Sequence, residues 1–496
     1  MALTVEEIQR FIENDKTSEK KKKARTGLRY YEGEHDIKDY KMYYVDGDGR
    51  LQEDKMRSNL KISHPFFTEL VDQQVQYMLS SDKPFVRSND AELQAALDDY
   101  FGDEFKTELQ ECLTGCITKG FENMYAYKSE SEKTRFMTAD SMGVVEVRGK
   151  DTDDGCDYVI YYYPDRIEKG NKGNKVIRVQ IWDKNTTTYY VQDGNGKIEL
   201  DDSVKTNPRP HITYKKTGDD ALYYKGNGGY GFIPFFRLDN NKKQTSGLKP
   251  IKALIDDYDL MACGLSNNLQ DISEGIYVVK GYPGANLDEM IQNVKVKKLI
   301  GVSPDGDIDI KTIDVPYEAR KAKLELDEKN IYRFGMGFNS AQIGDGNITN
   351  IVIKSRYALL DLKSDKLEIR LKQFLRKMLK VVLDEINEAL KTNYKMKDVQ
   401  IILEREVITN AKDNAEIDLI NAQRKNQETN TLLSAANMFD DETILIALCE
   451  ILDLDYEEVK ARIEEQAAEN PEKQIMAVRS ALNQISPDDG RKAAGE

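Results

Sequence analysis

The spacing of apolar residues predicts three long helices in the second half of the chain. Apolar side chains recur every three or four residues over 249–272, 317–340 and 351–391, which places them on one face of an α-helix. At about 1.5 Å per residue, the third helix is expected to be about 60 Å long. Its apolar residues in register are Leu360, Leu367, Leu371, Phe374, Met378, Val382, Ile386 and Leu390. Those of the first helix are Ile251, Leu254, Ile255, Tyr258, Met261, Leu265, Leu269 and Ile272.

The residues between these runs give the second half an elongated plan. Short alternating stretches, "GIYVVKGY", "VKVKKLIGV" and "GDIDIKTIDV", predict a β-rich insert between the first two helices. Residues 341–350, between the second and third helices, are small and polar. After the third helix we expect a short strand over 399–405, then an acidic helical part that ends in a disordered tail. These are the proportions of a rod and differ from those of a compact catalytic domain.

The N-terminus predicts an amphipathic helix over 3–26. Its apolar face contains Val5, Ile8, Phe11 and Ile12, and its end carries a lysine run, Lys20–Lys23. A solvated helix end is a better interpretation of this run than a contact with nucleic acid. Gly27 follows the run and is expected to end the helix.

The following 200 or so residues predict a hairpin, two helices and a sheet. The "DGDG" sequence of Asp46–Gly49 is typical of a hairpin turn. The next helix is expected to have Pro65 in its first turn and Ser63 as its cap. A further helical stretch covers 89–117, and a tyrosine-rich region of short alternating strands runs over 124–236.

Charge and composition limit the classes of function that the chain can have. The chain has 496 residues and a net charge of −15, which argues against nucleic-acid binding by bulk attraction, since such surfaces are normally basic. The charge is uneven: over 411–496, 19 acidic and 9 basic residues give −10, which leaves −5 for the rest. No run approaches the roughly 20 apolar residues of a membrane span, and the partly acidic N-terminus is unlike a secretory signal.

Candidate enzyme chemistry is sparse. The histidines His35, His64 and His211 have no metal-ligand spacing, and no catalytic triad can be assembled from them. "GVVEVRGKD" has the wrong spacing for a phosphate-binding loop and is better interpreted as a hairpin. "DGDIDI" lacks the glycine and the final glutamate of a calcium loop, which favours a turn. The glycines of "FGMGF" lie in a helical run, where close packing or a kink explains them better than cofactor binding.

The cysteines also favour a structural interpretation. There are five, an odd and sparse set that is typical of a reducing cytoplasm. Cys112 and Cys116 have helical spacing, but no histidine or further cysteine lies nearby to complete a metal site. We therefore expect both to be small core residues. No metal and no cofactor is predicted.

Four sequence motifs in order resemble the portal proteins of tailed bacteriophages, of the siphophage type from Gram-positive hosts. "YYEGEHDI" resembles the family's Tyr-Tyr-x-Gly-x-His-x-Ile segment, and "SNLKISHPFFTELVDQQVQYMLSSDKPF" resembles its Asn-x-Lys-Ile-x-His helix. The second motif departs from the pattern at Pro65 and at Ser80–Asp82, where the family usually has Asn and Gly. "GYGFIPFFRLDNN" resembles the family's Phe-Gly-x-Ile-Pro … Asn-Asn segment, and "LIDDYDLMACGLSNNLQDISEGIYVVKGY" resembles the stretch that enters the family's stem.

The resemblance implies an α+β portal-type fold that assembles as a ring, usually a dodecamer, at one capsid vertex. The ring serves as the channel for genome packaging and ejection, nucleates procapsid assembly and docks the terminase motor and later the head–tail adaptor. The implied segments are wing 1–248, stem helices 249–274 and 317–340, clip 275–316, tunnel loop 341–350, long wing helix and strand 351–410, crown 411–480 and tail 481–496.

The resemblance also implies where function lies. The tunnel loop is expected to face DNA with Gln342, Gly344, Asp345, Gly346, Asn347, Thr349 and Asn350. Flexible glycines and weakly bonding amides suit moving duplex, whereas a ring of arginines would grip its phosphates. Channel-lining or intersubunit stem residues are expected at Lys321, Lys323, Glu325, Lys329 and Arg333. Clip contacts with the motor or adaptor are expected at Lys295, Lys297, Lys298, Asp305 and Asp307.

The expected partners are further copies of the chain, double-stranded DNA, the terminase large subunit, the head–tail adaptor, and the major capsid and scaffolding proteins. No membrane partner is expected, and the location is the virion, with the host cytoplasm during assembly. Twelve acidic C-termini would surround the channel mouth with negative charge, although solubility is the better interpretation for the tail itself. Two alternatives stay open: another virion component, such as an adaptor or minor capsid protein, and an enzyme such as a nuclease or ATPase.

Overall fold

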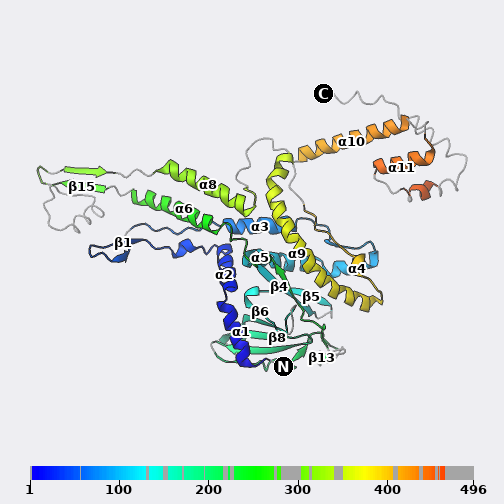
Figure 1. Ribbon diagram of the computed structural model, residues 1–496, viewed down its shortest axis with the longest axis horizontal. Helices are drawn as coiled ribbons and strands as arrows, with labels where there is room; N and C mark the ends of the chain where they lie inside the picture. Colours follow the sequence, from blue (N-terminus) through cyan, green and yellow to red (C-terminus); the bar gives the residue numbers. More distant parts are fainter. Residues whose placement is uncertain are drawn as a thin grey trace. The chain divides into compact units, whose positions relative to one another are not determined.

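The computed structural model divides the chain into two compact units, Met1–Gly346 with Lys354–Val407 and Asn347–Ile353 with Ile408–Glu496. Figure 1 shows the elements of each. The structure describes residues 3–55, 57–129, 133–148, 155–169, 172–194, 196–215, 222–223, 228–272, 276–280, 303–305, 307–311, 316–339, 350–405, 411–434, 439–452, 456 and 459–463.

The N-terminal segment forms two helices, α1 (Val5–Thr17) and α2 (Glu19–Tyr31), so the prediction of one helix over 3–26 is wrong. The break is at Ser18, whose extended backbone ends α1 and whose hydroxyl accepts a hydrogen bond from the third residue of α2. Gly27 lies inside α2 and does not end it. A Cβ at Gly27 would lie 2.0 Å from the carbonyl oxygen of Thr118, so this glycine permits close helix packing.

The interpretation of Lys20–Lys23 as a solvated helix end holds for only half of the run. Lys22 and Lys23 are exposed. Lys21 is 1 % exposed, and its ammonium donates to the carbonyls of Ser141 and Val144 and pairs with Asp15 at 2.9 Å. Lys20 lies 3.7 Å above the ring of Phe121, and burial lowers its pKa to about 8. The two halves differ because successive residues face different sides of a helix.

The predicted hairpin is confirmed as β1 (Tyr43–Val45) paired antiparallel with β2 (Leu51–Glu53). It follows a short 3₁₀ turn, η1 (Asp36–Asp39), and precedes α3 (Phe66–Met78). Pro65 occupies the N-cap position of α3 without a side-chain hydrogen bond, so the prediction of Ser63 as cap is wrong. The Ser63 hydroxyl donates instead to the carbonyl of Gly33 at 2.8 Å.

The main core lies between helices and a three-stranded sheet. The helical stretch predicted over 89–117 is two helices, α4 (Ala91–Tyr100) and α5 (Asp103–Lys119), separated by Phe101 and Gly102. The sheet has the order β14 (Phe235–Asp239), β4 (Phe121–Lys128) and β5 (Thr134–Ala139). A 3₁₀ turn, η2 (Ser141–Gly143), follows β5.

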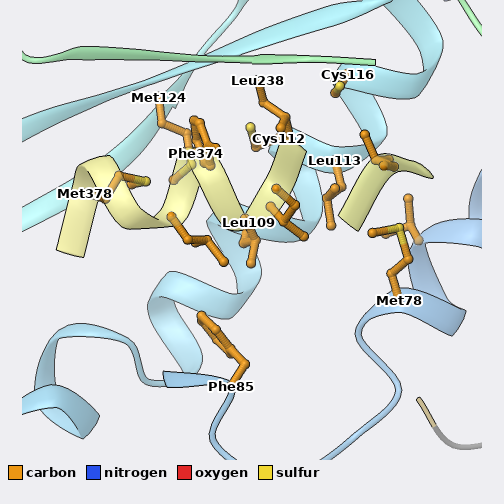
Figure 2. Packing of buried hydrophobic residues seen from close by; sticks show 14 of the residues in the cluster. Met78, Phe85, Leu109, Cys112, Leu113, Cys116, Met124, Leu238, Phe374 and Met378 are labelled. Atoms are coloured by element: carbon orange, nitrogen blue, oxygen red, sulfur yellow. The ribbon is translucent and has the colours of Figure 1, made fainter. Parts of the chain in front are cut away.

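Figure 2 shows the centre of this core, where residues of α5 such as Leu109 and Cys112 face Phe374 and Met378 of the long helix α9. Cys112 and Cys116 are fully buried, which confirms them as core residues. Burial raises the pKa of both thiols, because the thiolate loses its hydration there.

A larger antiparallel sheet has the strand order β10-β9-β8-β7-β6, with β11 also paired to β9. Helix α1 packs on it through Ile8 and Ile12, which join a cluster with Val145, Ile160 and Val179. Its strands contain many of the tyrosines of the region that the sequence predicts to be β, as in β7 and β9. The strands are β6 (Val144–Val147), β7 (Tyr158–Lys169), β8 (Lys172–Trp182), β9 (Thr186–Asp193), β10 (Ile198–Leu200) and β11 (Arg209–Pro210), followed by the separate pair β12 (Tyr214–Lys215) and β13 (Leu222–Tyr223).

The second half of this unit follows the predicted plan. Helix α6 (Lys252–Ile272) leads to β15 (Ile276–Lys280), which pairs antiparallel with β16 (Asp307–Lys311), and α8 (Tyr317–Gly335) follows. The middle segment of the predicted insert lies outside the described residues, and Asp305 lies in a turn before β16. Helix α8 ends at Gly335, before the predicted end at residue 340.

The long helix is α9 (Asn350–Leu390), with 41 residues. Seven of its eight predicted apolar positions are at most 3 % exposed, and the exception is Leu390, at 40 %. Asn350, predicted to belong to the loop, is its first residue. The strand predicted over 399–405 is shorter: after η5 (Met396–Asp398), β17 (Gln400–Ile401) pairs with β3 (Val86–Arg87).

The second unit contains α10 (Ala411–Ser434) and α11 (Asp441–Leu452), which pack against each other. The predicted tail over 481–496 lies outside the described residues. Among the helices that the structure describes, none has the length and apolar character that crossing a membrane requires.

Candidate functional site: the helix pair α6 and α8

Helices α6 and α8 lie side by side and are joined at one end by the β15–β16 hairpin (Figure 1). Polar bonds hold them together along their length. Lys323 of α8 donates to Asp257 of α6 at 2.5 Å and also pairs with Asp327. The guanidinium of Arg320 lies 2.7 and 2.8 Å from the side-chain oxygen of Asn268 once that amide is oriented to accept. Two cations of α8 are therefore bonded within their own chain.

The remaining charged residues predicted for this helix share one exposed stripe. Lys321, Glu325, Lys329 and Arg333 recur every fourth residue, and all four are exposed. Apolar residues flank them: Leu326 is 54 % exposed and Phe334 is 52 % exposed. Lys323, the fifth predicted residue, lies off this stripe because it faces α6. Its pKa is raised, chiefly by its hydrogen bonds to Asp257 and Asp327.

The buried face of α6 differs from the apolar stripe that the sequence suggests. In the first turns Ile255 is buried, but the face continues through Asp259, Cys263 and Asn267, all at most 3 % exposed. Leu269, on the predicted stripe, is 58 % exposed. The second half of α6 thus buries polar side chains, and these need partners from the rest of the unit.

Asp259 finds its partners in two of the motifs that resemble the portal family. His35 of "YYEGEHDI" lies with Nδ1 at 2.6 Å from Oδ2 of Asp259. His64 of "KISHP" lies with Nδ1 at 2.7 Å from Oδ1, and its amide donates to the same oxygen at 2.9 Å. Burial alone would raise the pKa of Asp259, but the hydrogen bonds from His35 and His64 hold it below its ordinary value.

Neighbouring groups complete a polar joint around His35, which is fully buried. Its ring stacks on that of Tyr30, with centroids 4.5 Å apart, and the Tyr30 hydroxyl bonds to Asp256 of α6. Lys252 at the start of α6 bonds to Asp36 at 2.6 Å and to Asp256 at 2.7 Å. Residues far apart in sequence therefore fasten the base of α6 to the N-terminal part of the unit.

Sequence reasoning missed this joint because it tested the histidines only as metal ligands. Among the described residues, no group of three or more His, Cys, Asp or Glu could hold a metal ion. A usable signal was present in Asp259 itself: it lies four residues after Ile255, so it continues the apolar stripe of α6. A carboxylate on a buried helix face predicts a cationic or hydrogen-bonding partner.

The chain that follows α8 is held in place at Phe338. The amide of Phe338 donates to Gln73 Oε1 at 3.0 Å, and Gln73 Nε2 donates back to the carbonyl of Phe338 at 2.7 Å. The ring of Phe338 stacks on that of Tyr357 in α9, with centroids 5.2 Å apart. Gly337 lies against α3, where a Cβ would come within 2.0 Å of Leu70. The glycines of "FGMGF" therefore serve close packing, as expected.

Most residues predicted to face DNA or partner proteins lie outside the described part of the chain. These are Gln342, Gly344, Asp345, Gly346, Asn347 and Thr349 of the loop and Lys295, Lys297 and Lys298 of the insert. Asp305 is exposed, and Asp307 is the first residue of β16.

Comparison with known proteins agrees with this order of elements. Residues 10–473 match the family described as "Phage portal protein, SPP1 Gp6-like". The portal protein of Bacillus phage SPP1 is 28 % identical over 352 residues, which cover 71 % of this chain and 67 % of that protein. The portal protein of Clostridium phage phiCD119 is 26 % identical over 376 residues, covering 72 % and 77 % respectively. The match spans both histidine motifs, the helix pair and α9, and on this evidence the chain belongs to the SPP1 Gp6-like family of phage portal proteins.

Proposed function

We propose that copies of this chain close into a ring, expected to be a dodecamer, at one vertex of a phage capsid. Double-stranded DNA passes through the ring during packaging and ejection, driven by a separate terminase motor. The single observation that carries this proposal is the order of elements within the family match: a helix pair with a β hairpin at its end, a segment anchored at Phe338, and a helix of 41 residues.

The anchored Phe338 supports the role of residues 341–349 as a tunnel loop. Gln73 and Tyr357 hold Phe338 in place, so movement of the intervening residues need not disturb the helices on either side. The sequence of this segment, AQIGDGNIT, contains two glycines and the polar residues Gln342, Asn347 and Thr349, and it contains no cation. A segment of this composition contacts duplex weakly, whereas cations would bind phosphates and resist translocation.

The exposed stripe of α8 supports a contact between neighbouring subunits. Lys321, Glu325, Lys329 and Arg333 alternate with exposed Leu326 and Phe334, a mixture typical of protein interfaces with a polar rim. In a closed ring each subunit offers this face to its neighbour, and the charges pair across the contact or line the channel. The hairpin end of the helix pair, with Asp305 and Asp307, then meets the motor and later the head–tail adaptor.

Assembly tests the ring directly. We expect the purified full-length chain to form annular particles with rotational symmetry in electron microscopy, with a mass that is a multiple of 56.7 kDa. A chain that stays monomeric in assembly-permissive salt, and forms no rings in infected cells, refutes the proposal.

Deletion of residues 341–349 tests the loop. Because the flanking contacts of Phe338 with Gln73 and Tyr357 remain, rings are expected to assemble normally. The DNA packaged per procapsid is expected to fall, as measured by nuclease protection. A matched control replaces the segment with Gly and Ser residues of equal length, and normal packaging by the deletion variant excludes a role for the loop.

The portal protein family is structural, and we expect no catalysis by this chain. Purified rings are expected to show neither ATP turnover nor metal-dependent cleavage of duplex. Either activity, retained through a second purification step and lost with the protein, would favour the enzymatic alternative.

A further inference from the structure

An extended segment, residues 60–64, lies along α6 and is bonded to it by a regular ladder of hydrogen bonds. We refer to this segment as the strap. Its alternate backbone amides donate to side chains of α6 that lie four residues apart. From one end to the other, the bonds are Leu60 N–H to Asn267 Oδ1 (2.7 Å), Ile62 N–H to Cys263 Sγ (3.2 Å) and His64 N–H to Asp259 Oδ1 (2.9 Å).

The ladder is regular because two periods nearly match. Two residues of extended chain advance about 6.6 Å, and four residues of an α-helix advance about 6.0 Å. Every second amide of the strap therefore meets every fourth side chain of α6. Cys263 strengthens the central rung because its thiol also donates to the carbonyl of Ile62, at 3.4 Å.

Burial of strap side chains does not explain this contact. Ile62 is 48 % exposed and Lys61 is exposed, so the middle of the strap contacts the helix through its backbone and not through buried side chains. On the helix, by contrast, Asp259, Cys263 and Asn267 are almost fully buried. The polar face of α6 is therefore matched to the backbone of the strap, which supplies the partners that these buried groups need.

The ladder permits one alignment. Towards the start of α6 the same stripe continues as Ile255 and Ile251, which cannot accept a hydrogen bond. A strap shifted by one step in that direction would place the amide of His64 against Ile255. A shift in either direction would also remove His64 from Asp259, whose other oxygen is held by His35 at 2.6 Å.

His35 adds a second fixed contact to this alignment. Its Nδ1 faces the carboxylate of Asp259, and its Nε2 faces the carbonyl of Tyr30 at 3.2 Å. Asp259 is thus held by His35 on one oxygen and by His64 on the other, and a shifted strap would leave this buried carboxylate with fewer partners, which is costly.

We propose that Asp259, Cys263 and Asn267 are positioning residues that fix the axial and rotational position of the first stem helix against the strap. Each residue of shift along α6 corresponds to about 1.5 Å of translation and about 100° of rotation. The ladder thereby determines where the β15–β16 hairpin projects from the N-terminal part of the unit. The effect of the ladder on DNA packaging rests on the portal function proposed above. The hydrogen bonds of the ladder can be measured whether or not that function is correct.

Residue-resolved hydrogen exchange on the full-length chain tests the ladder. Among the described residues, no hydrogen bond is found for the amides of Lys61 and Ser63, whereas Leu60, Ile62 and His64 are bonded. We expect the bonded amides to exchange at least about tenfold more slowly than the other two. Uniform exchange across residues 60–64 in the wild-type chain overturns the proposal, and this outcome needs no variant to fold.

Matched variants test the rungs one by one. Cys263→Ser keeps a group that both donates and accepts, and Cys263→Val keeps the size without either. Exchange at Ile62 is expected to stay within about threefold of wild type in C263S and to rise at least about tenfold in C263V. Asn267→Asp and Asn267→Leu form the equivalent pair for Leu60. Equal exchange within both pairs refutes the role of these side chains.

Electron microscopy of variant rings tests the positioning role. In C263V combined with N267L, the hairpin end is expected to lie displaced relative to the wild-type ring, and packaged DNA is expected to fall. The serine and aspartate variants are expected to retain the wild-type position and packaging. An unchanged hairpin position in the double variant, despite lost protection of the strap, overturns the positioning role but leaves the portal function standing.

Discussion

Replacing Asp259 isolates the polar joint between α6 and the N-terminal part of the unit. Asp259→Leu keeps a side chain of similar size on the buried face of α6 but removes every acceptor. Three donors then lose their partner: Nδ1 of His35, Nδ1 of His64 and the amide of His64. Because His35 and Asp259 are both fully buried, solvent cannot replace the bond that His35 loses.

The expected cost follows from the burial. Leaving a buried hydrogen-bonding group without its partner costs about 1–3 kcal/mol, so the loss of three bonds is expected to cost about 3–5 kcal/mol in total, compared with about 0–1 kcal/mol for an exposed pair. Asp259→Asn keeps one oxygen for His64 but removes the charge opposite His35, so about 2–3 kcal/mol is expected. The matched control is Asp257→Asn, two residues away on the same helix, whose partner Lys323 is 38 % exposed.

Unfolding of the full-length chain in urea, at one protein concentration, measures these differences. At pH 7 we expect the order of stability to be wild type and D257N, then D259N, then D259L. The reasoning fails if D259L is within about 1 kcal/mol of D257N, because the buried joint would then contribute no more than a surface ion pair.

The pH dependence of the same variants gives an independent check. The pKa of Asp259 is lowered in the folded chain, so its stabilising contribution is complete above the ordinary aspartate value of about 3.9. The contribution is lost as pH falls through the lowered value. The gap between wild type and D259N is therefore expected to narrow as the pH falls below about 4, where the carboxylate of Asp259 becomes protonated. A gap that does not narrow there contradicts this assignment.

Three further substitutions test other contacts of the same unit by thermal unfolding. Gly337→Ala is expected to cost about 1–3 kcal/mol, because the new Cβ would meet Leu70 at 2.0 Å, whereas Gly47→Ala, with nothing within 4 Å, is expected to be nearly neutral. Equal effects of the two would contradict the close packing of α3 against the end of α8. Arg405→Lys is expected to cost about 1–3 kcal/mol, because a lysine cannot reproduce the several hydrogen bonds by which the guanidinium of Arg405 joins three carboxylates of α9. An unchanged stability would show that these bonds are unimportant. Lys21→Met is expected to cost about 3–5 kcal/mol, since it leaves two buried carbonyls and one carboxylate without their cation. Lys22→Met is its exposed control. If Lys21→Met costs no more stability than Lys22→Met, the interpretation of Lys20–Lys23 as a solvated helix end is favoured.

The helices of the second half were predictable from the sequence because their apolar period is long and regular. Over α9, 41 residues give enough repeats for the buried face to be assigned almost completely. Boundaries were less predictable where a single residue decides them, as at Ser18, whose hydroxyl caps a new helix. The period of apolar residues contains no information about such a cap when the residues on both sides are helical.

The joint around Asp259 could not be predicted from the sequence, for a different physical reason. Asp259, His35 and His64 are far apart in the chain, and each is ordinary in its own segment. Only the fold brings two imidazoles to one carboxylate. The paired hydrogen bonds between Gln73 and Phe338 likewise depend on the fold. There the side-chain amide of Gln73 bonds to the backbone amide and carbonyl of Phe338, as a neighbouring strand would.

These joints differ from the core in how strongly their interactions depend on direction. Apolar packing between α5 and α9 stabilises the unit but tolerates small shifts, because dispersion and burial depend weakly on direction. Hydrogen bonds to buried carboxylates, amides and thiols depend strongly on distance and angle. Such bonds occur here where α6 meets the strap and where the loop joins α8. A protein whose parts must keep their alignment while DNA moves past them needs directional bonds at its joints. We therefore expect substitutions at these joints to change geometry before they abolish assembly, and substitutions in the core to do the reverse.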